Sequence, residues 1–220
     1  MNLEEFKSTL TSGNYDNIKP FLRMEVRNKA NLGPNDYYKD IIGDIVTVVT
    51  FQTTLDDNSV VSAVATNTLI NRLGSSVLEL LNDARLNTPC NFKLDRLSDI
   101  VINARREGKL ISAQYPLDSI ETLLTSDELL DCILVVSIDA ITRVSILQFP
   151  KLLRRIYGKI GDYYIIPSSV YEQMIIPADK IYDIDHVKAI IHQVNNTVVK
   201  STDKLSDKLL KYNNLGLSEC

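Results

Sequence analysis

Histidine and glycine are scarce in this sequence, and each scarcity removes a class of chemistry. The only histidines are His186 and His192, and six residues turn a helix through about 240°, so the pair does not share a face for binding a metal. The eight glycines form no phosphate-binding cluster. Their nearest approach, at 158–161, follows a predicted helix instead of a strand. We therefore expect no metal and no cofactor.

Cysteine is also rare, and long hydrophobic runs are missing. Cys90, Cys132 and Cys220 have no CxxC spacing and cannot all pair with one another, as expected in a reducing compartment. Residues 1–10 carry two glutamates and no signal-peptide pattern. No stretch reaches the ~18 apolar residues of a membrane span. We expect a cytoplasmic protein with no membrane partner.

Positive charge is not in excess. The 24 lysines and arginines are outnumbered by 28 acidic residues, which gives a formal net charge of −4. Proteins that bind a phosphate backbone usually present a basic domain or face, so we do not expect nucleic acid as a partner. Basic residues do recur in two apolar helical patterns, where we interpret them as solvated helix faces. They are Arg105, Arg106, Lys151, Arg154, Arg155 and Lys159.

The composition is that of a globular protein, with 45% hydrophobic and 24% charged residues. At 220 residues the chain slightly exceeds the usual domain size of roughly 100–200 residues. A loop signal at residues 31–35 separates an N-terminal helical segment, residues 1–35, from an α+β domain, residues 36–200. Residues 201–220 follow as a C-terminal tail with a weak apolar pattern, which suggests a helix end or a fraying terminus.

Within the central region, pairs of predicted strands are each followed by predicted helix. The three repeats are strands 44–51 and 60–66 with helices 68–73 and 75–86, strands 131–138 and 141–149 with helix 151–160, and strands 163–166 and 171–176 with helix 184–194. Further helical patterns cover 3–10, 18–30 and 94–109. Because the strands come in adjacent pairs, we predict an α+β fold of repeated β-β-α units, with antiparallel sheet and helices on one face.

One predicted turn concentrates polar groups between two apolar strands. Ser168 and Ser169 follow Pro167 there, with Glu172 close in sequence and both histidines downstream, so a serine triad can be sketched. The flanking residues are not G-x-S-x-G, however, and serine after proline is common in turns. We therefore assign no catalytic residue and keep Ser168, Ser169 and Glu172 as candidates for a small hydrolase.

The same block, 162–172, reads DYYIIPSSVYE and resembles the signature D-F-Y-I-L-P-S-S-V-H-E of an uncharacterised family of Clostridia, related Firmicutes and their phages. Residues 86–89, 194–197 and 205–212 carry weaker matches. Tyr171 stands where the signature has histidine, which removes the best acid/base candidate. The resemblance implies a cytoplasmic bacterial or phage protein and brings no established activity. Its motif positions are Asn87, Pro89, Pro167, Ser168, Ser169, Glu172, Asn195, Ser206 and Asp207.

The absence of convergent chemistry and the abundance of hairpins favour a non-catalytic interaction protein. We expect it to assemble with itself or to bind another protein through a sheet edge or an exposed helix face. A small hydrolase at the turn 167–169 is the alternative. Nucleic-acid binding through Arg105, Arg106, Arg154 and Arg155 is the second alternative.

Overall fold

The computed structural model describes residues 1–89, 91–98, 100, 115–116, 133–138 and 143–220. Its α-helices are α1 (Leu3–Thr11), α2 (Tyr15–Ile18), α3 (Asn67–Leu73), α4 (Val77–Asn87), α7 (Pro150–Ile160) and α8 (Ile184–Thr197). Its strands are β1 (Leu22–Asn28), β2 (Tyr38–Ile42), β3 (Ile45–Thr54), β4 (Val60–Val64), β5 (Asn91–Arg96), β6 (Tyr115–Pro116), β7 (Leu134–Ile138), β8 (Tyr163–Ile166), β9 (Glu172–Pro177), β10 (Leu210–Asn213) and β11 (Gly216–Glu219).

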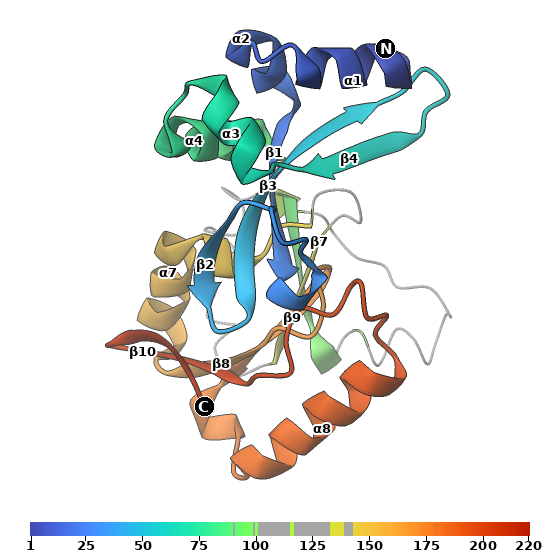
Figure 1. Cartoon of the computed structure of the whole chain (residues 1–220). Coiled ribbons are helices and arrows are strands. Elements are labelled where there is room, and N and C mark those ends of the chain that lie inside the picture. The colour runs from blue at the N-terminus through green and yellow to red at the C-terminus, as the bar shows by residue number, and fades with distance from the viewer. Residues whose placement is uncertain (90, 99, 101–114, 117–132, 139–142) are drawn as a thin grey trace.

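The strands form two antiparallel sheets (Figure 1). In the four-stranded sheet, β3 pairs with β1 on one side and with β2 and β4 on the other. The seven-stranded sheet has the order β11-β10-β8-β9-β7-β5-β6, and every pairing in it is antiparallel. The predicted α+β class with antiparallel sheet is confirmed.

The hairpin of β3 and β4 follows directly from the local sequence. β3 is rich in β-branched residues, which suit the pleated and buried position it takes. The five-residue turn between the strands closes with a hydrogen bond from Leu55 N to Ser59 O, and Asn58 adopts a φ of 64°, which asparagine tolerates. The predicted strands at 44–51 and 60–66 are thus confirmed as a hairpin.

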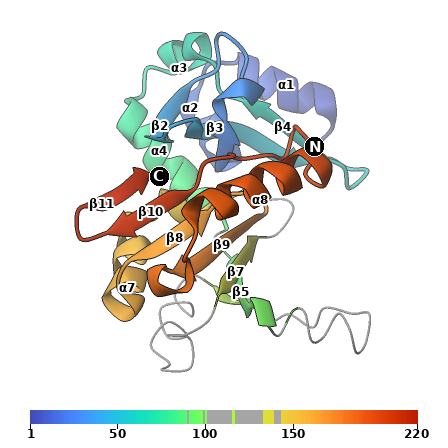
Figure 2. The same ribbon diagram turned by 90° about the horizontal axis from the view of Figure 1, so that it is seen from below.

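Helices cover both faces of the seven-stranded sheet. Tyr163 and Ile165 of β8 point into the main core beside α7, and the Tyr163 hydroxyl donates to Leu153 O at 2.9 Å. Tyr164 and Ile166 point the other way and pack with Ile191 of α8. Figure 2 shows α8 in front of β8 and β9. The sequence predicts helices on one face only, but β8 is buried on both of its faces, so each face requires a cover.

Three predicted segments are wrong. The pattern at 18–30 predicts a helix, but residues 22–28 form strand β1, in which the alternate residues Leu22, Met24 and Val26 point into the protein core. The predicted strand 141–149 contains, in its described part, a short 3-10 helix at Ile146–Gln148, because Ser145 and Gln148 form a capping box. The tail 201–220, predicted as a helix end or a fraying terminus, instead contains a hairpin of β10 and β11, and β10 pairs with β8.

The predicted helix at 94–109 is also wrong at its start, because β5 extends to Arg96 and pairs with β7. Residues 101–109 of that prediction lie outside the described residues. The helices predicted at 75–86, 151–160 and 184–194 are confirmed as α4, α7 and α8. Their caps are local: Ser76 accepts from Glu79 N, and Asp183 accepts from His186 N.

A buried carboxylate joins the N-terminal helices to α4. The Tyr15 hydroxyl donates to Asp83 Oδ2 at 2.7 Å, and Lys19 Nζ lies 3.1 Å from the same oxygen. The hydrogen bond from Tyr15, assisted by Lys19, outweighs desolvation and holds the pKa of Asp83 below its usual range.

Tyr15→Phe is expected to destabilise the protein near neutral pH and much less at low pH. Asp83 has a depressed pKa in the folded state, so its contribution is present above its unfolded pKa of about 3.9 and is lost as pH falls through the folded pKa. Urea unfolding over a series of pH values, from about pH 7 down to the lowest pH at which the protein remains folded, measures the difference. Tyr182→Phe is the control, because Tyr182 is 95% exposed. A loss that stays constant over the whole pH series would contradict the coupling.

Candidate functional site

Four of the motif residues, from three distant stretches of chain, meet in one hydrogen-bonded group. The Ser168 hydroxyl donates to Asn195 Oδ1 at 2.7 Å. Asn195 Nδ2 donates to Ser206 O and to Asp207 Oδ1, both at 2.9 Å. We call these four residues the Asn195 cluster. Asn195 is 2% exposed and Ser206 is fully buried, so the amide of Asn195 is satisfied entirely by protein groups.

The Asn195 cluster also reaches the four-stranded sheet. The Ser206 hydroxyl donates to Asp44 Oδ1 at 2.7 Å, and Asn28 Nδ2 donates to Asp44 Oδ2 and to Leu205 O, both at 2.8 Å. Asp44 lies directly before β3, and Asn28 ends β1. The cluster therefore connects the turn 167–169, helix α8 and the segment 205–207 to both sheets.

Asp207 carries the charge of the cluster. Burial by itself would raise the pKa of Asp207, but hydrogen bonds from Lys204 and Asn195 outweigh it and lower that pKa below its ordinary value. His192 Nδ1 lies 3.7 Å from Asp207 Oδ2. The carboxylate thus stays ionised at neutral pH and accepts hydrogen bonds.

The candidate hydrolase residues do not form a relay in this arrangement. Ser168 donates to an amide oxygen, which is too weak a base to take its proton. The Ser169 hydroxyl accepts from the backbone N–H groups of Tyr171 and Glu172 at 3.2 and 3.1 Å. Glu172 is exposed, and Pro167 O accepts from Ser206 N at 3.0 Å. The contacts of Pro167, Ser168 and Ser169 order a turn.

The remaining motif positions lie elsewhere. Asn87, at the end of α4, donates from Nδ2 to Lys19 O at 2.6 Å. Its neighbour Thr88 is buried and accepts from Met24 N at 2.7 Å, which fixes the end of α4 to β1. Pro89 borders a shallow cavity of about 330 Å³ beside the β3–β4 hairpin. The motif 87–89 therefore anchors a helix end.

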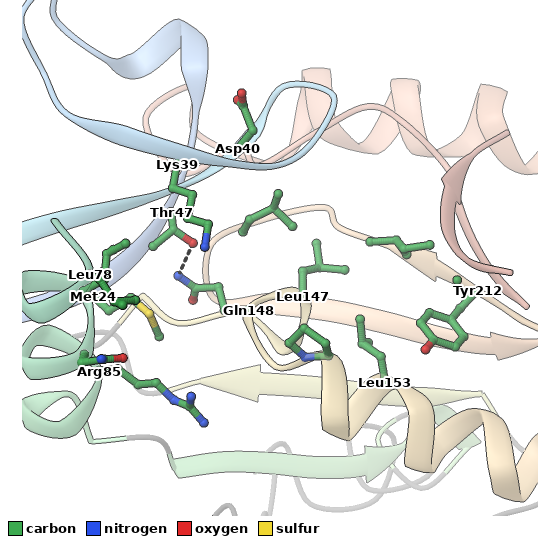
Figure 3. A pocket seen from close by; sticks show the side chains of 16 residues that line it. Met24, Lys39, Asp40, Thr47, Leu78, Arg85, Leu147, Gln148, Leu153 and Tyr212 are labelled. Atoms are coloured by element: carbon green, nitrogen blue, oxygen red, sulfur yellow. Dashed lines mark hydrogen bonds between the residues drawn. The ribbon is translucent and has the colours of Figure 1, made fainter. Parts of the chain in front are cut away.

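A larger groove lies between the two sheets, with a volume of about 500 Å³. We call it the inter-sheet groove. Figure 3 shows Lys39 of β2, Arg85 of α4 and Gln148 around it. Gln148 Nε2 donates to Thr47 Oγ1 at 3.0 Å and to Glu25 O at 3.2 Å. Its apolar lining comprises Met24, Ile41, Leu78, Leu81, Leu147, Pro150, Leu153, Tyr212 and Leu217.

Sequence patterns did not identify the inter-sheet groove. Its lining comes from separate stretches between Met24 and Leu217, and in each stretch the residues serve an ordinary helix or strand. Lys39 and Arg85 lie 46 positions apart in the numbering of the chain, and only tertiary packing brings them to one groove. The one local signal is Gln148, whose capping role at Ser145 is visible in the sequence.

The described residues contain neither a metal-binding cluster nor a membrane-spanning helix. Among the described residues, no three His, Cys, Asp or Glu side chains gather in a way that would hold a metal ion. None of the described helices combines the length and the apolar character needed to cross a membrane.

These observations define an α+β protein with two antiparallel sheets, in which four motif residues form a hydrogen-bonded junction between the sheets. The chain belongs to a family of unknown function, DUF5688, whose family model matches residues 9–214. No curated protein and no solved structure matches the chain.

Proposed function

We propose that this protein is a non-catalytic assembly protein that pairs with a second copy of itself through strand β4. The observation that carries the proposal is the outer edge of β4, Val60–Val64, which is partly exposed and carries no charged residue and no proline. Among the described strands, only β3 pairs with β4. In Figure 1 the β3–β4 hairpin projects beyond the rest of its sheet.

Because the hydrogen-bonded residues alternate along an antiparallel strand, the pairing of β4 with β3 shows which backbone groups of β4 point outward. Leu55 N donates to Ser59 O, and Ala65 N donates to Val49 O, so the odd-numbered residues of β4 bond to β3. The N–H and C=O groups of Val60, Ser62 and Val64 therefore point away from β3. A strand with such a row of groups and no charge to block it is a template for pairing.

The sequence of β4 is nearly the same in both directions, V-V-S-A-V. Antiparallel pairing about Ser62 sets Val60 opposite Val64 of the second copy and Val61 opposite Ala63. Such a pairing is a closed twofold contact, which does not propagate into fibres. β-Branched pairs and a serine pair directly opposite one another each contribute modestly and favourably.

Ser62→Lys is expected to abolish the dimer, because it sets two like charges directly opposite one another. The mass in solution, measured by sedimentation equilibrium over a wide concentration range, reports the result. Ser218→Lys, on the edge strand β11, controls for the added charge, and Ser62→Ala controls for the lost hydrogen bond from Ser62 Oγ to Glu25 Oε1; both are expected to leave the dimer intact. A wild-type protein that stays monomeric at the highest concentration would overturn the proposal.

The cytoplasmic location and the bacterial or phage origin belong to the same proposal. They rest on the lack of a CxxC spacing and on the resemblance carried by residues 162–172. The two alternative functions have less support. Ser168 has no base as its hydrogen-bond partner, and of the four arginines considered for nucleic acid, Arg105 and Arg106 lie outside the described residues.

A further inference from the structure

The inter-sheet groove combines a long apolar lining with a positive charge that the protein does not neutralise. Within the described part of the chain, Lys39 forms no ion pair, and Arg85 has only a cation–π contact, 5.9 Å from the centre of the Phe149 ring. In Figure 3 the Lys39 side chain lies above Gln148 and the Arg85 side chain lies below Met24, so the two cations border the groove from opposite walls. Unpaired cations beside an apolar wall favour a ligand that carries both an anion and an apolar body.

The acidic residue of the groove does not cancel this charge. Asp40 borders the groove, but its Oδ1 lies 2.7 Å from Lys29 Nζ. In Figure 3 the Asp40 carboxylate points away from Lys39 and Gln148. The single acidic side chain among the lining residues is therefore already paired and faces outward.

The start of α7 adds to the positive potential. This helix begins at Pro150, which lines the groove, and it has neither a side-chain cap nor an acidic residue in its first turn. Figure 3 shows the helix running away from the groove, so its positive end faces the groove. Pro150 has no N–H group, and the N–H groups of Leu152 and Leu153 donate to Phe149 O at 2.9 and 3.1 Å. This end of α7 therefore contributes through its helix dipole, beside the two side-chain cations.

From this arrangement we infer that the inter-sheet groove binds a small amphiphilic carboxylate with a single alkyl chain. Its carboxylate lies at the end of the groove that Lys39 and Arg85 border, and its chain lies along the apolar lining formed by Leu81, Leu153 and Leu217. The groove volume of about 500 Å³ falls in the roughly 300–1,000 Å³ range of small-molecule sites. No lining residue belongs to β4, so this site is independent of the proposed pairing.

A matched panel of twelve-carbon compounds tests the inference on the full chain. Calorimetric titration with dodecanoate, dodecanol and dodecylamine keeps the number of carbon atoms constant and varies the head group from anion to neutral to cation. Dodecanoate is expected to bind about tenfold or more tightly than dodecanol, and dodecylamine is expected to bind most weakly. Equal binding of all three compounds, or no binding of dodecanoate, would overturn the inference.

Substitutions in the inter-sheet groove test whether dodecanoate binds there. The double substitution Lys39→Gln and Arg85→Gln is expected to weaken dodecanoate about tenfold and to leave dodecanol unchanged. Leu217→Trp, which fills the groove, is expected to weaken both compounds. Lys159→Gln, at the far end of α7, removes one positive charge elsewhere and is expected to change neither. Equal losses of dodecanoate affinity in Lys159→Gln and in the double variant would contradict the assignment.

Discussion

Asn195→Ala is expected to lower the free energy of unfolding by about 2–4 kcal/mol. The substitution removes the acceptor of the Ser168 hydroxyl and the donor to Ser206 O and Asp207. Because Asn195 is 2% exposed, water cannot readily replace these partners. The higher helix propensity of alanine offsets the loss by only about 0.5 kcal/mol.

The neighbouring residue provides the matched control. Asn196 lies in the same turn of α8 but is exposed, so Asn196→Ala has the same change in helix propensity without the buried contacts. We expect it to change stability by less than about 0.5 kcal/mol. Denaturant unfolding of both variants gives the comparison. Equal stabilities would show that the Asn195 cluster does not hold the segments together.

Glu25→Ala is expected to cost about 3 kcal/mol, because it breaks a buried ion pair and leaves its partners unsatisfied. Glu25 is 3% exposed, and its Oε2 lies 2.9 Å from Arg27 Nη2. Its Oε1 accepts from Thr50 Oγ1 at 3.1 Å and from Ser62 Oγ at 3.3 Å. This carboxylate therefore ties β1 to both β3 and β4.

A double-mutant cycle separates the ion pair from the other contacts of Glu25. Arg27→Ala is expected to cost less than Glu25→Ala, because the Arg27 side chain is 22% exposed and can be hydrated. The double variant is expected to be more stable than the sum of the two single losses predicts. Additive losses would show that Glu25 and Arg27 do not interact in solution.

The sequence predicts correctly those helices and strands whose turns and caps are formed by neighbouring residues. The β3–β4 hairpin carries its own turn, and α4, α7 and α8 carry their own caps or an N-terminal proline. The segment 18–30 was predicted as helix because its apolar residues fit both periods over a short length. Leu22–Asn28 form a strand because they pair with β3. Tertiary pairing therefore overrides the local pattern there.

In the candidate site, too, single residues are predictable from the sequence, whereas their contacts depend on tertiary packing. Ser168, Asn195, Ser206 and Asp207 were identified as motif positions, but no spacing in the sequence indicates that they share one hydrogen-bonded group. Asp44 and Asn28 were not identified at all, since an Asp before a strand and an Asn at its end resemble ordinary turn residues. Only the packing of the two sheets brings them to Ser206 and Leu205.

Disulfide cross-linking of Ser62→Cys tests the proposed pairing through β4 most directly. In an antiparallel pairing about position 62, the two Cα atoms lie about 5.5 Å apart, within the range of about 4.4–6.8 Å that a disulfide spans. We predict that Ser62→Cys cross-links with itself more than the wild type, which has an exposed Cys220. Val60→Cys is expected to exceed the wild type only when it is mixed with Val64→Cys. A Ser62→Cys protein that cross-links no more than the wild type, or no more than Ser218→Cys, would contradict pairing through β4.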